Sequence, residues 1–276
     1  MVVGEGASGH ERRHHGGVDE FGQFAQRIGR AATYVLAAVA VVWSLRTIEV
    51  IPEFLYDAPE QTADLFRRMW PIDWSFWGEM VADALVETFH TATLGTIIAL
   101  VLSVPVALLA ARNVTPSATL NLVAKFILVS SRSVNSLIWA LLFVAVFGPG
   151  ALAGTLAIAF RSIGFVGKLL AEALEEMPRG PLEALAATGA PRSSILLKGY
   201  WPQVEPSFWS VALFRWDINI RESAVLGLVG AGGIGVALDT ALNNLYWDQV
   251  GLCLLVIFAV VIATEIATSA IRSRII

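Results

Sequence analysis

The sequence predicts an all-α fold: a polytopic membrane helix bundle of six transmembrane spans with both termini in the cytoplasm. Of its 276 residues, 56% are hydrophobic and only 15% are charged, whereas soluble domains carry about 25% charged residues. Two uncharged runs, Thr88–Ala111 and Ser133–Phe160, are longer than the roughly 20 residues with which a helix crosses a bilayer. This composition excludes a soluble domain, and no nucleic-acid partner is expected.

The N-terminal residues 1–27 are polar and rich in glycine, which predicts a disordered cytoplasmic tail. His10, His14 and His15 lie in this tail. A flexible segment offers no fixed ligand geometry, so no metal site is expected. The first span follows at about residues 28–46.

Residues 47–84 form the longest loop between spans and carry many acidic residues. Trp70, Trp74, Phe76 and Trp77 cluster near the end of this loop, as aromatic residues do at membrane interfaces. A short helix lying on the outer membrane surface is therefore expected here.

Five further spans follow, and together with the first they are expected to form a single transmembrane domain, residues 28–276. Gly148-Pro149-Gly150 predicts a tight turn between two of these spans. Their expected positions are about residues 86–111, 120–147, 151–170, 206–229 and 249–271.

The basic residues predict the orientation, because cytoplasmic segments of membrane proteins are enriched in Lys and Arg. If the N-terminus lies inside, the outer segments contain only Arg46, Arg67 and Arg68, and most other basic residues outside the spans lie on the inner side. The polar segment 171–205 is then cytoplasmic, as is the C-terminus.

A short helix is expected in the middle of segment 171–205. Pro181 suits the first position of a helix, Gly189 can adopt the left-handed conformation that ends one, and Pro191 prevents its continuation. The body of this helix consists of small residues: Ala184, Ala186, Ala187 and Thr188. Such a helix buries little by itself, so its shape fits either a plain connector or a knob that docks into another protein.

The same stretch resembles the coupling loop of ABC-importer permeases, which carry Glu-Ala-Ala, then a Gly, then Leu-Pro. Glu183, Ala184, Gly189 and Pro202 match that pattern position for position. The resemblance implies that the short helix docks into a groove of a separate ATPase subunit. The implied ATPase-coupling residues are Glu183, Ala184, Ala187, Gly189 and Pro202. The sequence departs from the pattern at Leu185, where a second Ala is usual, at Gly199, where Ile is usual, and at Trp201, where Leu is usual.

Four arginines at membrane depth are candidates for a translocation pathway: Arg132, Arg161, Arg215 and Arg221. Ionisable residues are costly there and usually face an interior or a water-filled path. Asp217 precedes Arg221 by about one helical turn, which places both on one helix face. Glu222 follows Arg215 by about two turns. Two structural ion pairs are therefore an alternative to a role towards substrate for these residues.

Arg132 and Arg161 have no acidic neighbour in the sequence. Each must find a partner on another helix, reach the membrane surface or face an aqueous cavity. An unpaired arginine in a pathway would favour an anion, because its guanidinium group binds carboxylate or phosphate-like oxygens through two parallel hydrogen bonds.

A glycine-rich stretch ends the fifth span, and Gly230, Gly232 and Gly235 match the dinucleotide-binding pattern. That pattern requires a preceding strand and a following helix in a soluble unit, so the membrane context excludes it. Together with Gly233, these residues instead predict close helix packing or a broken helix around a pathway.

We find no nucleotide-binding loop or catalytic constellation. The chain is expected to be no enzyme and to need no cofactor.

Residues 85–272 resemble the phosphonate ABC-transporter permease family. The segments that carry this resemblance are Leu109–Asn113, Trp139–Val144, Phe147–Gly150, Gly164–Lys168, Ala171–Ala173, Phe214–Arg221, Val225–Gly235 and Asp248–Val250. Two departures lie near the expected pathway. Arg161 stands where His is common, and Ser133-Val134 follows Arg132 where a Pro-Glu pair is common.

The resemblance implies a type I ABC-importer permease fold in a multi-pass protein of the bacterial plasma membrane. The implied partners are a second copy of the chain, a cytoplasmic ABC ATPase dimer, an extracytoplasmic substrate-binding protein and the lipid bilayer. Transport would proceed by alternating access and would be driven by the ATPase, with phosphonate, phosphite and phosphate as open choices of substrate.

Three alternatives remain. A permease for another small solute, such as methionine, would share this architecture. A membrane-embedded enzyme would need a catalytic cluster within the membrane, where His90 is the single histidine. A passive channel would have no use for the segment from Glu183 to Pro202.

Overall fold

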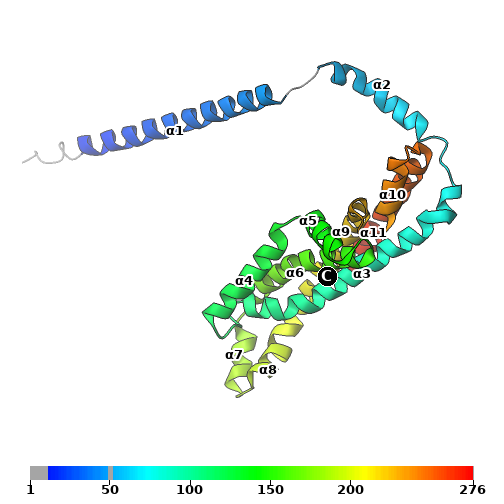
Figure 1. The fold of residues 1–276 in the computed structure, drawn as a ribbon. Coiled ribbons are helices and arrows are strands. Elements are labelled where there is room, and N and C mark those ends of the chain that lie inside the picture. The colour runs from blue at the N-terminus through cyan, green and yellow to red at the C-terminus, as the bar shows by residue number, and fades with distance from the viewer. Residues whose placement is uncertain (1–11, 49–51, 276) are drawn as a thin grey trace, which may run out of the picture. The chain divides into compact units, whose positions relative to one another are not determined.

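The structure, a computed structural model, describes residues 12–48 and 52–275, and all the elements in that part of the chain are helices (Figure 1). The predicted all-α fold is confirmed. The chain divides into two compact units, residues 1–63 and 64–276.

The first unit contains α1, Arg12–Thr47, and the start of α2, Pro52–Arg68. Within α1, Gln26–Thr47 is long and apolar enough to cross a membrane, at the position of the first predicted span. α2 lies in the loop for which a short surface helix is predicted.

α1 begins inside the segment 1–27, for which the sequence predicts a disordered tail. The difference has a local reason, because residues with good helix propensity, such as Glu20, Gln23 and Ala25, connect directly to the apolar span and extend its helix towards the N-terminus. Residues 1–11, with His10, lie outside the described part of the chain.

The second unit holds the other helices. In chain order they are η1 (Trp77–Val81), α3 (Ala82–Ala110), α4 (Ala118–Ser133), α5 (Ser136–Phe147), α6 (Ala151–Glu175), α7 (Gly180–Ala187), α8 (Arg192–Ile195), η2 (Leu196–Tyr200), α9 (Trp201–Leu226), η3 (Gly227–Val229), α10 (Ile234–Asn243) and α11 (Trp247–Ile275).

α6 is the central helix of this unit, because α3, α4, α5 and α9 all pack against it. Small residues allow the close approach. A Cβ atom on Gly95 of α3 would lie 2.7 Å from Cγ2 of Ile158 on α6. A Cβ atom on Gly154 of α6 would clash with the carbonyl oxygen of Ala231. Such contacts are typical of membrane helices that pack through small residues.

Over the described residues, five helices are long and apolar enough to cross a membrane, and a sixth span results when α4 and α5 are taken together. The third predicted span, residues 120–147, is therefore not one continuous helix as expected, because α4 and α5 are bent by 92°. Val134 between them is extended (φ −99°, ψ 139°). The Asn135 side chain accepts a hydrogen bond from Leu137 N at 3.1 Å and caps α5, as polar residues of this kind do at helix starts.

The fifth predicted span also breaks. α9 begins at Trp201, earlier than the predicted start near residue 206, and ends at Leu226. The chain then passes through glycines with positive φ, including Gly230 (+80°) and Gly232 (+85°), before α10 begins. Only glycine adopts this conformation without strain, so the glycine-rich stretch interrupts the helix here.

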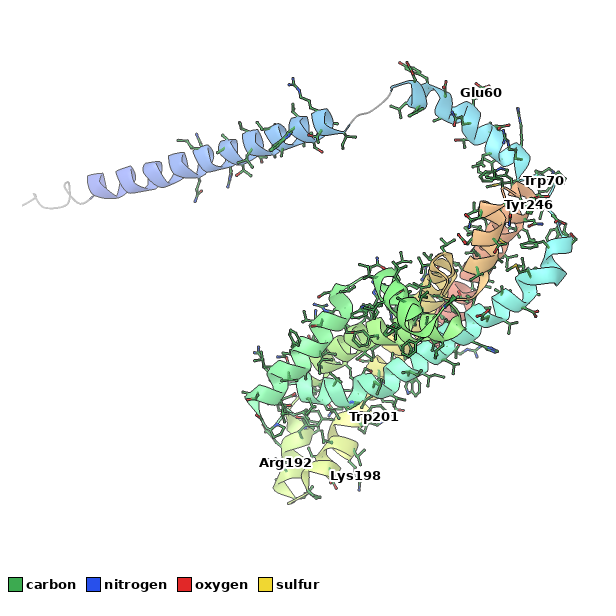
Figure 2. The ribbon with its side chains drawn as sticks, viewed as in Figure 1. Glu60, Trp70, Arg192, Lys198, Trp201 and Tyr246 are labelled. Carbon is green, nitrogen blue, oxygen red and sulfur yellow. The ribbon has the colours of Figure 1, made fainter. Side chains whose placement is uncertain are left out.

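The two ends of the second unit differ in character. Trp70 and Tyr246 lie at one end, whereas Arg192 and Lys198 lie at the other (Figure 2). Basic residues at the cytoplasmic end are what the predicted orientation requires.

Candidate functional site

A cavity of about 280 Å³ lies where α4, α6 and α9 meet. We call it the central cavity, and its lining residues are Arg132, Ser133, Arg161, Phe165 and Arg215. At 1.5 Å per residue, Arg161 lies about 15 Å from the start of α6 and Arg215 about 16 Å from the end of α9. Both therefore lie near the middle of a hydrocarbon core about 30 Å thick.

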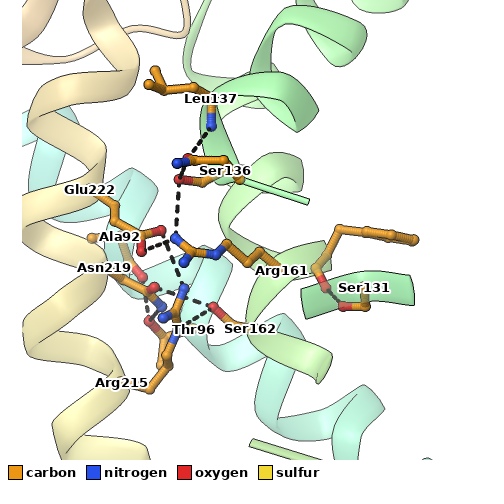
Figure 3. A network of polar contacts seen from close by, with 12 residues as sticks. Ala92, Thr96, Ser131, Ser136, Leu137, Arg161, Ser162, Arg215, Asn219 and Glu222 are labelled. Atoms are coloured by element: carbon orange, nitrogen blue, oxygen red, sulfur yellow. Dashed lines mark hydrogen bonds and ion pairs between the residues drawn. The ribbon is translucent and has the colours of Figure 1, made fainter. Parts of the chain in front are cut away.

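Glu222 binds two of these arginines at once (Figure 3). Its Oε2 accepts a hydrogen bond from Nη2 of Arg215 at 3.2 Å, and its Oε1 accepts one from Nη1 of Arg161. One carboxylate thus joins α6 to α9 and shares its single negative charge between two guanidinium groups.

Arg215 is held by further contacts and is only 3% exposed. Its Nε donates to Oγ of Ser162 at 2.8 Å, and its guanidinium carbon lies 5.4 Å from the centre of the Phe165 ring. Ser162 donates in turn to Asn219 at 3.2 Å, and Asn219 donates to Thr96 at 2.8 Å. This chain of hydrogen bonds across α9, α6 and α3 leaves the Arg215 side chain little freedom to move.

Arg161 connects the central cavity to the break between α4 and α5. Its Nη1 donates to Oγ of Ser136 at 3.3 Å, in the first turn of α5, and Ser136 donates to Oδ1 of Asn135 at 3.3 Å. A movement of α5 relative to α4 would therefore change the position of the Arg161 guanidinium group.

Arg132 lies in the last turn of α4 and is exposed. Among the residues that the structure describes, no acidic side chain forms an ion pair with it. The central cavity thus brings together three arginines, Arg132 included, against the single carboxylate of Glu222. Because the net charge of this group is positive, and guanidinium groups are forked donors, the cavity is suited to an oxyanion.

Arg221 does not line the central cavity. It forms an ion pair with Asp217 one turn earlier on α9, and Arg215 pairs with Glu222, so both ion pairs suggested by the sequence are confirmed. The contact between Arg161 and Glu222 could not be read from the sequence, because these residues lie on different helices and no local spacing relates them.

The short helix α7 has an inner and an outer face. Leu182 and Leu185 are partly buried, whereas Glu183, Ala184 and Ala187 are exposed. Gly189, just after the helix, has φ +75°, as predicted from its helix-ending role. Pro202 lies in the first turn of α9.

The inner face of α7 packs against Gly199 of η2. A Cβ atom on Gly199 would lie 2.8 Å from Cδ2 of Leu182 and 3.0 Å from Cδ1 of Leu185. The large residue at position 185 and the missing side chain at position 199 therefore compensate each other, so these two departures from the coupling-loop pattern have one common structural cause.

The glycine-rich break packs tightly against α3 and α6. A Cβ atom on Gly232 would lie 2.6 Å from Oε1 of Glu87. Gly150 N donates to the carbonyl oxygen of Gly230 at 2.9 Å, and Ile234 N donates to Oγ1 of Thr88 at 2.8 Å. Backbone and side-chain contacts together thus fix the glycine-rich break, and Gly232 lies too close to its neighbours for a Cβ atom.

Residues 103–275 match the family described as binding-protein-dependent transport system inner membrane component. This match covers more than half of the chain, and it includes α4 to α11 with the central cavity and α7.

Similar proteins come from several bacteria. The phosphate-import permease protein PhnE of Mycolicibacterium smegmatis is 40% identical over 235 residues, which are 84% of this chain and 44% of that protein. The chain thus spans less than half the length of this relative. The phosphite transport system permease protein PtxC of Stutzerimonas stutzeri is 36% identical over 90% of both chains. The probable D-methionine transport system permease protein MetI of Haemophilus influenzae is 30% identical over 58% of this chain and 79% of that protein.

Solved structures share the fold. The methionine ABC transporter MetNI in inward-facing conformations matches with a TM-score of 0.61 and 22% identity, over 71% of this chain and 96% of that chain. A bacterial alginate ABC transporter matches with a TM-score of 0.61 and 15% identity, over 88% of this chain and 94% of that chain.

Proposed function

The chain belongs to the family of binding-protein-dependent transport system inner membrane components, and from this membership we propose that it is the membrane-spanning permease subunit of an ATP-driven importer of phosphorus oxyanions. It is a multi-pass inner-membrane subunit that transports its substrate and catalyses no reaction itself. ATP is hydrolysed by an associated ABC ATPase.

One observation carries the choice of substrate. The central cavity lies at mid-membrane depth and is lined by three arginines. Among the described residues, Glu222 is the one carboxylate that forms ion pairs with them. A neutral or zwitterionic solute would leave this positive charge unbalanced, whereas a phosphonate, phosphite or phosphate ion would neutralise it through charge-assisted hydrogen bonds. Relatives named for phosphate import and phosphite transport support the same class of substrate.

The partners follow from the family and from the shape of segment 171–205. The exposed face of α7, with Glu183, Ala184 and Ala187, is free to dock into an ATPase groove, and Gly189 and Pro202 fix the ends of the loop that carries it. We further propose that residues 28–276 act as one permease domain that pairs with a second copy of itself, and that an extracytoplasmic binding protein delivers the anion.

The test is substrate-stimulated ATP hydrolysis in liposomes that contain the permease with the ATPase and binding protein encoded beside it. Phosphonate, phosphite, phosphate and methionine are added in turn. Stimulation by a phosphorus oxyanion, but not by methionine, is expected. A response to methionine alone would keep the importer architecture and overturn the proposed substrate class.

The same liposomes test the coupling role of α7. Glu183→Ala is expected to abolish uptake while the protein still folds, because it changes only an exposed residue. Glu205→Ala, at an exposed acidic residue in α9 at the end of the same segment, is the matched control. Equal uptake by the wild type and Glu183→Ala would contradict the docking role.

A further inference from the structure

Arg132 also lines a second cavity, of about 230 Å³, between α4 and the later part of α6. We call it the inner cavity. Its other charged lining residues are Lys125, Lys168, Glu172 and Glu175. Lys168 lies about 10 Å farther along α6 than Arg161, towards the end of the helix that leads into segment 171–205. The inner cavity is therefore on the predicted cytoplasmic side of the central one, and the two cavities share Arg132.

Helical spacing explains why these cations form one row. On α4, Lys125 and Arg132 are separated by two turns and face the same side. On α6, Arg161 and Lys168 have the same separation, and Lys168 is followed one turn later by Glu172. The facing sides of the two helices thus present cations from mid-membrane depth to the inner end.

The charge balance changes along this row. In the central cavity, Glu222 is the one carboxylate that pairs with the arginines within the described part of the chain. In the inner cavity each lysine has its own carboxylate: Lys168 lies 3.2 Å from Glu172 and Lys125 lies 3.9 Å from Glu175. Arg132, which belongs to both cavities, stands between an excess of positive charge and a neutral group.

From this gradient we propose that the inner cavity is the release site for the transported oxyanion. Arg132, which lines both cavities, binds the anion as it passes from the central to the inner cavity. There Glu172 and Glu175 compete with the anion for the two lysines, so the anion dissociates faster into the cytoplasm. This inference rests on the proposed function, because only an anionic substrate would be held by the first cavity and released by the second.

The lysine–glutamate pairs contribute little to folding. The side chains of Lys168 and Glu172 are 42% and 48% exposed, and ion pairs between such exposed side chains stabilise a fold only weakly. Glu175 has one structural contact, since its Oε1 accepts a hydrogen bond from Arg112 N at 2.8 Å. A glutamine at either position keeps a carbonyl oxygen as acceptor and removes only the charge.

The experiment measures how fast radiolabelled inorganic phosphate dissociates from the purified permease–ATPase complex. Glu172→Gln leaves Lys168 unpaired, so dissociation is expected to slow by up to about fivefold, the factor that corresponds to one exposed ion pair. Transport turnover in liposomes should fall in parallel. Glu176→Gln, at an exposed acidic residue that does not line the cavity, is expected to match the wild type.

A second substitution separates charge from structure. The double variant Glu172→Gln/Lys168→Gln restores the wild-type net charge of the inner cavity, so dissociation should return to the wild-type rate. A merely structural role would instead make the double variant worse than the single one. If either substitution prevents folding, Glu175→Gln is measured in its place, with the same expected slowing.

The outcomes distinguish this inference from the proposed function. If the wild type binds and transports an oxyanion but Glu172→Gln and Glu175→Gln dissociate at the wild-type rate, the release site is wrong and the proposed function stands. The release site is equally wrong if Glu176→Gln slows dissociation as much as Glu172→Gln does. If the wild type neither binds nor transports any oxyanion, both proposals fail together.

Discussion

Arg215 is held at three places along its side chain: Nε by Ser162, Nη2 by Glu222 and the face of the guanidinium group by Phe165. This arrangement uses the planar, forked geometry of arginine rather than its charge alone. Because the group is buried, each of these contacts matters more than it would at the surface.

Arg215→Lys therefore tests whether geometry or charge decides transport. Lysine keeps the positive charge but cannot make the two directed hydrogen bonds, and a hydrogen bond to a charged group is worth about 1.5–3 kcal/mol. Oxyanion-stimulated uptake is expected to fall by about tenfold or more. Arg221→Lys, on the same helix but outside the central cavity, is the matched control and should retain most uptake. Equal losses in both variants would mean that the central cavity has no special role.

At the residue scale, the sequence could predict contacts between residues on one helix, because helical spacing places them on the same face. It could not predict contacts between residues on different helices. The pair Asp217–Arg221 follows from one turn of helix, and its prediction is correct. Arg161 also required a partner on another helix, but Glu222 could not be chosen in advance, because two helices can pack in many registers. The sequence therefore named three arginines of the central cavity without showing that they meet there.

At the scale of elements, the packing of α7 on η2 depends on a matched pair of positions. Leu185 is larger than the residue usual in the coupling-loop pattern, and Gly199 is smaller. Packed interiors tolerate exchanges that conserve total volume far better than single changes of size. The orientation of α7, and with it the exposed Glu183, rests on this contact.

A double-mutant cycle tests this compensation. Gly199→Ile alone should lower thermal stability and coupling, because its Cβ atom would already lie 2.8 Å from Leu182 Cδ2 and 3.0 Å from Leu185 Cδ1. Adding Leu185→Ala removes the second of these clashes but not the first, so the double variant should recover only part of the loss, with an interaction free energy of about 0.5–3 kcal/mol. The measurements are the thermal unfolding midpoint in detergent and substrate-stimulated ATP hydrolysis. Simple addition of the two single effects would show that the positions do not compensate.

Span positions were predictable from apolar runs, but the breaks within spans were less so. The glycines from Gly230 to Gly235 predicted one break, because positive φ and close packing both require glycine there. The break between α4 and α5 depends on weaker signals, since Ser133 and Asn135 also occur within membrane helices when neighbours satisfy the backbone. Tertiary contacts, such as the hydrogen bond between Arg161 and Ser136, determine whether the helix breaks at this point.

At the scale of the whole molecule, the transmembrane unit arranges charge by depth. The glycine-rich end carries exposed Asp83 and partly buried Glu87, the middle carries the arginines of the central cavity, and the inner end carries balanced lysine–glutamate pairs. An anion delivered to this unit would encounter its strongest attraction at mid-membrane depth. Selectivity should then depend on how much charge the anion itself carries.

The net positive charge of the central cavity predicts a preference for dianions over monoanions. A phosphorus oxyanion loses its second proton near neutral pH, about pH 6 for a phosphate ester. As the pH falls through the second pKa of the ion that is tested, the dianion becomes a monoanion, so the affinity of the purified permease–ATPase complex for phosphate or phosphite should fall with it. Glu222→Gln adds one positive charge to the cavity and should raise the affinity for the monoanion. Affinity that is independent of pH in the wild type, measured by equilibrium binding, would mean that the three arginines do not act together on the bound anion.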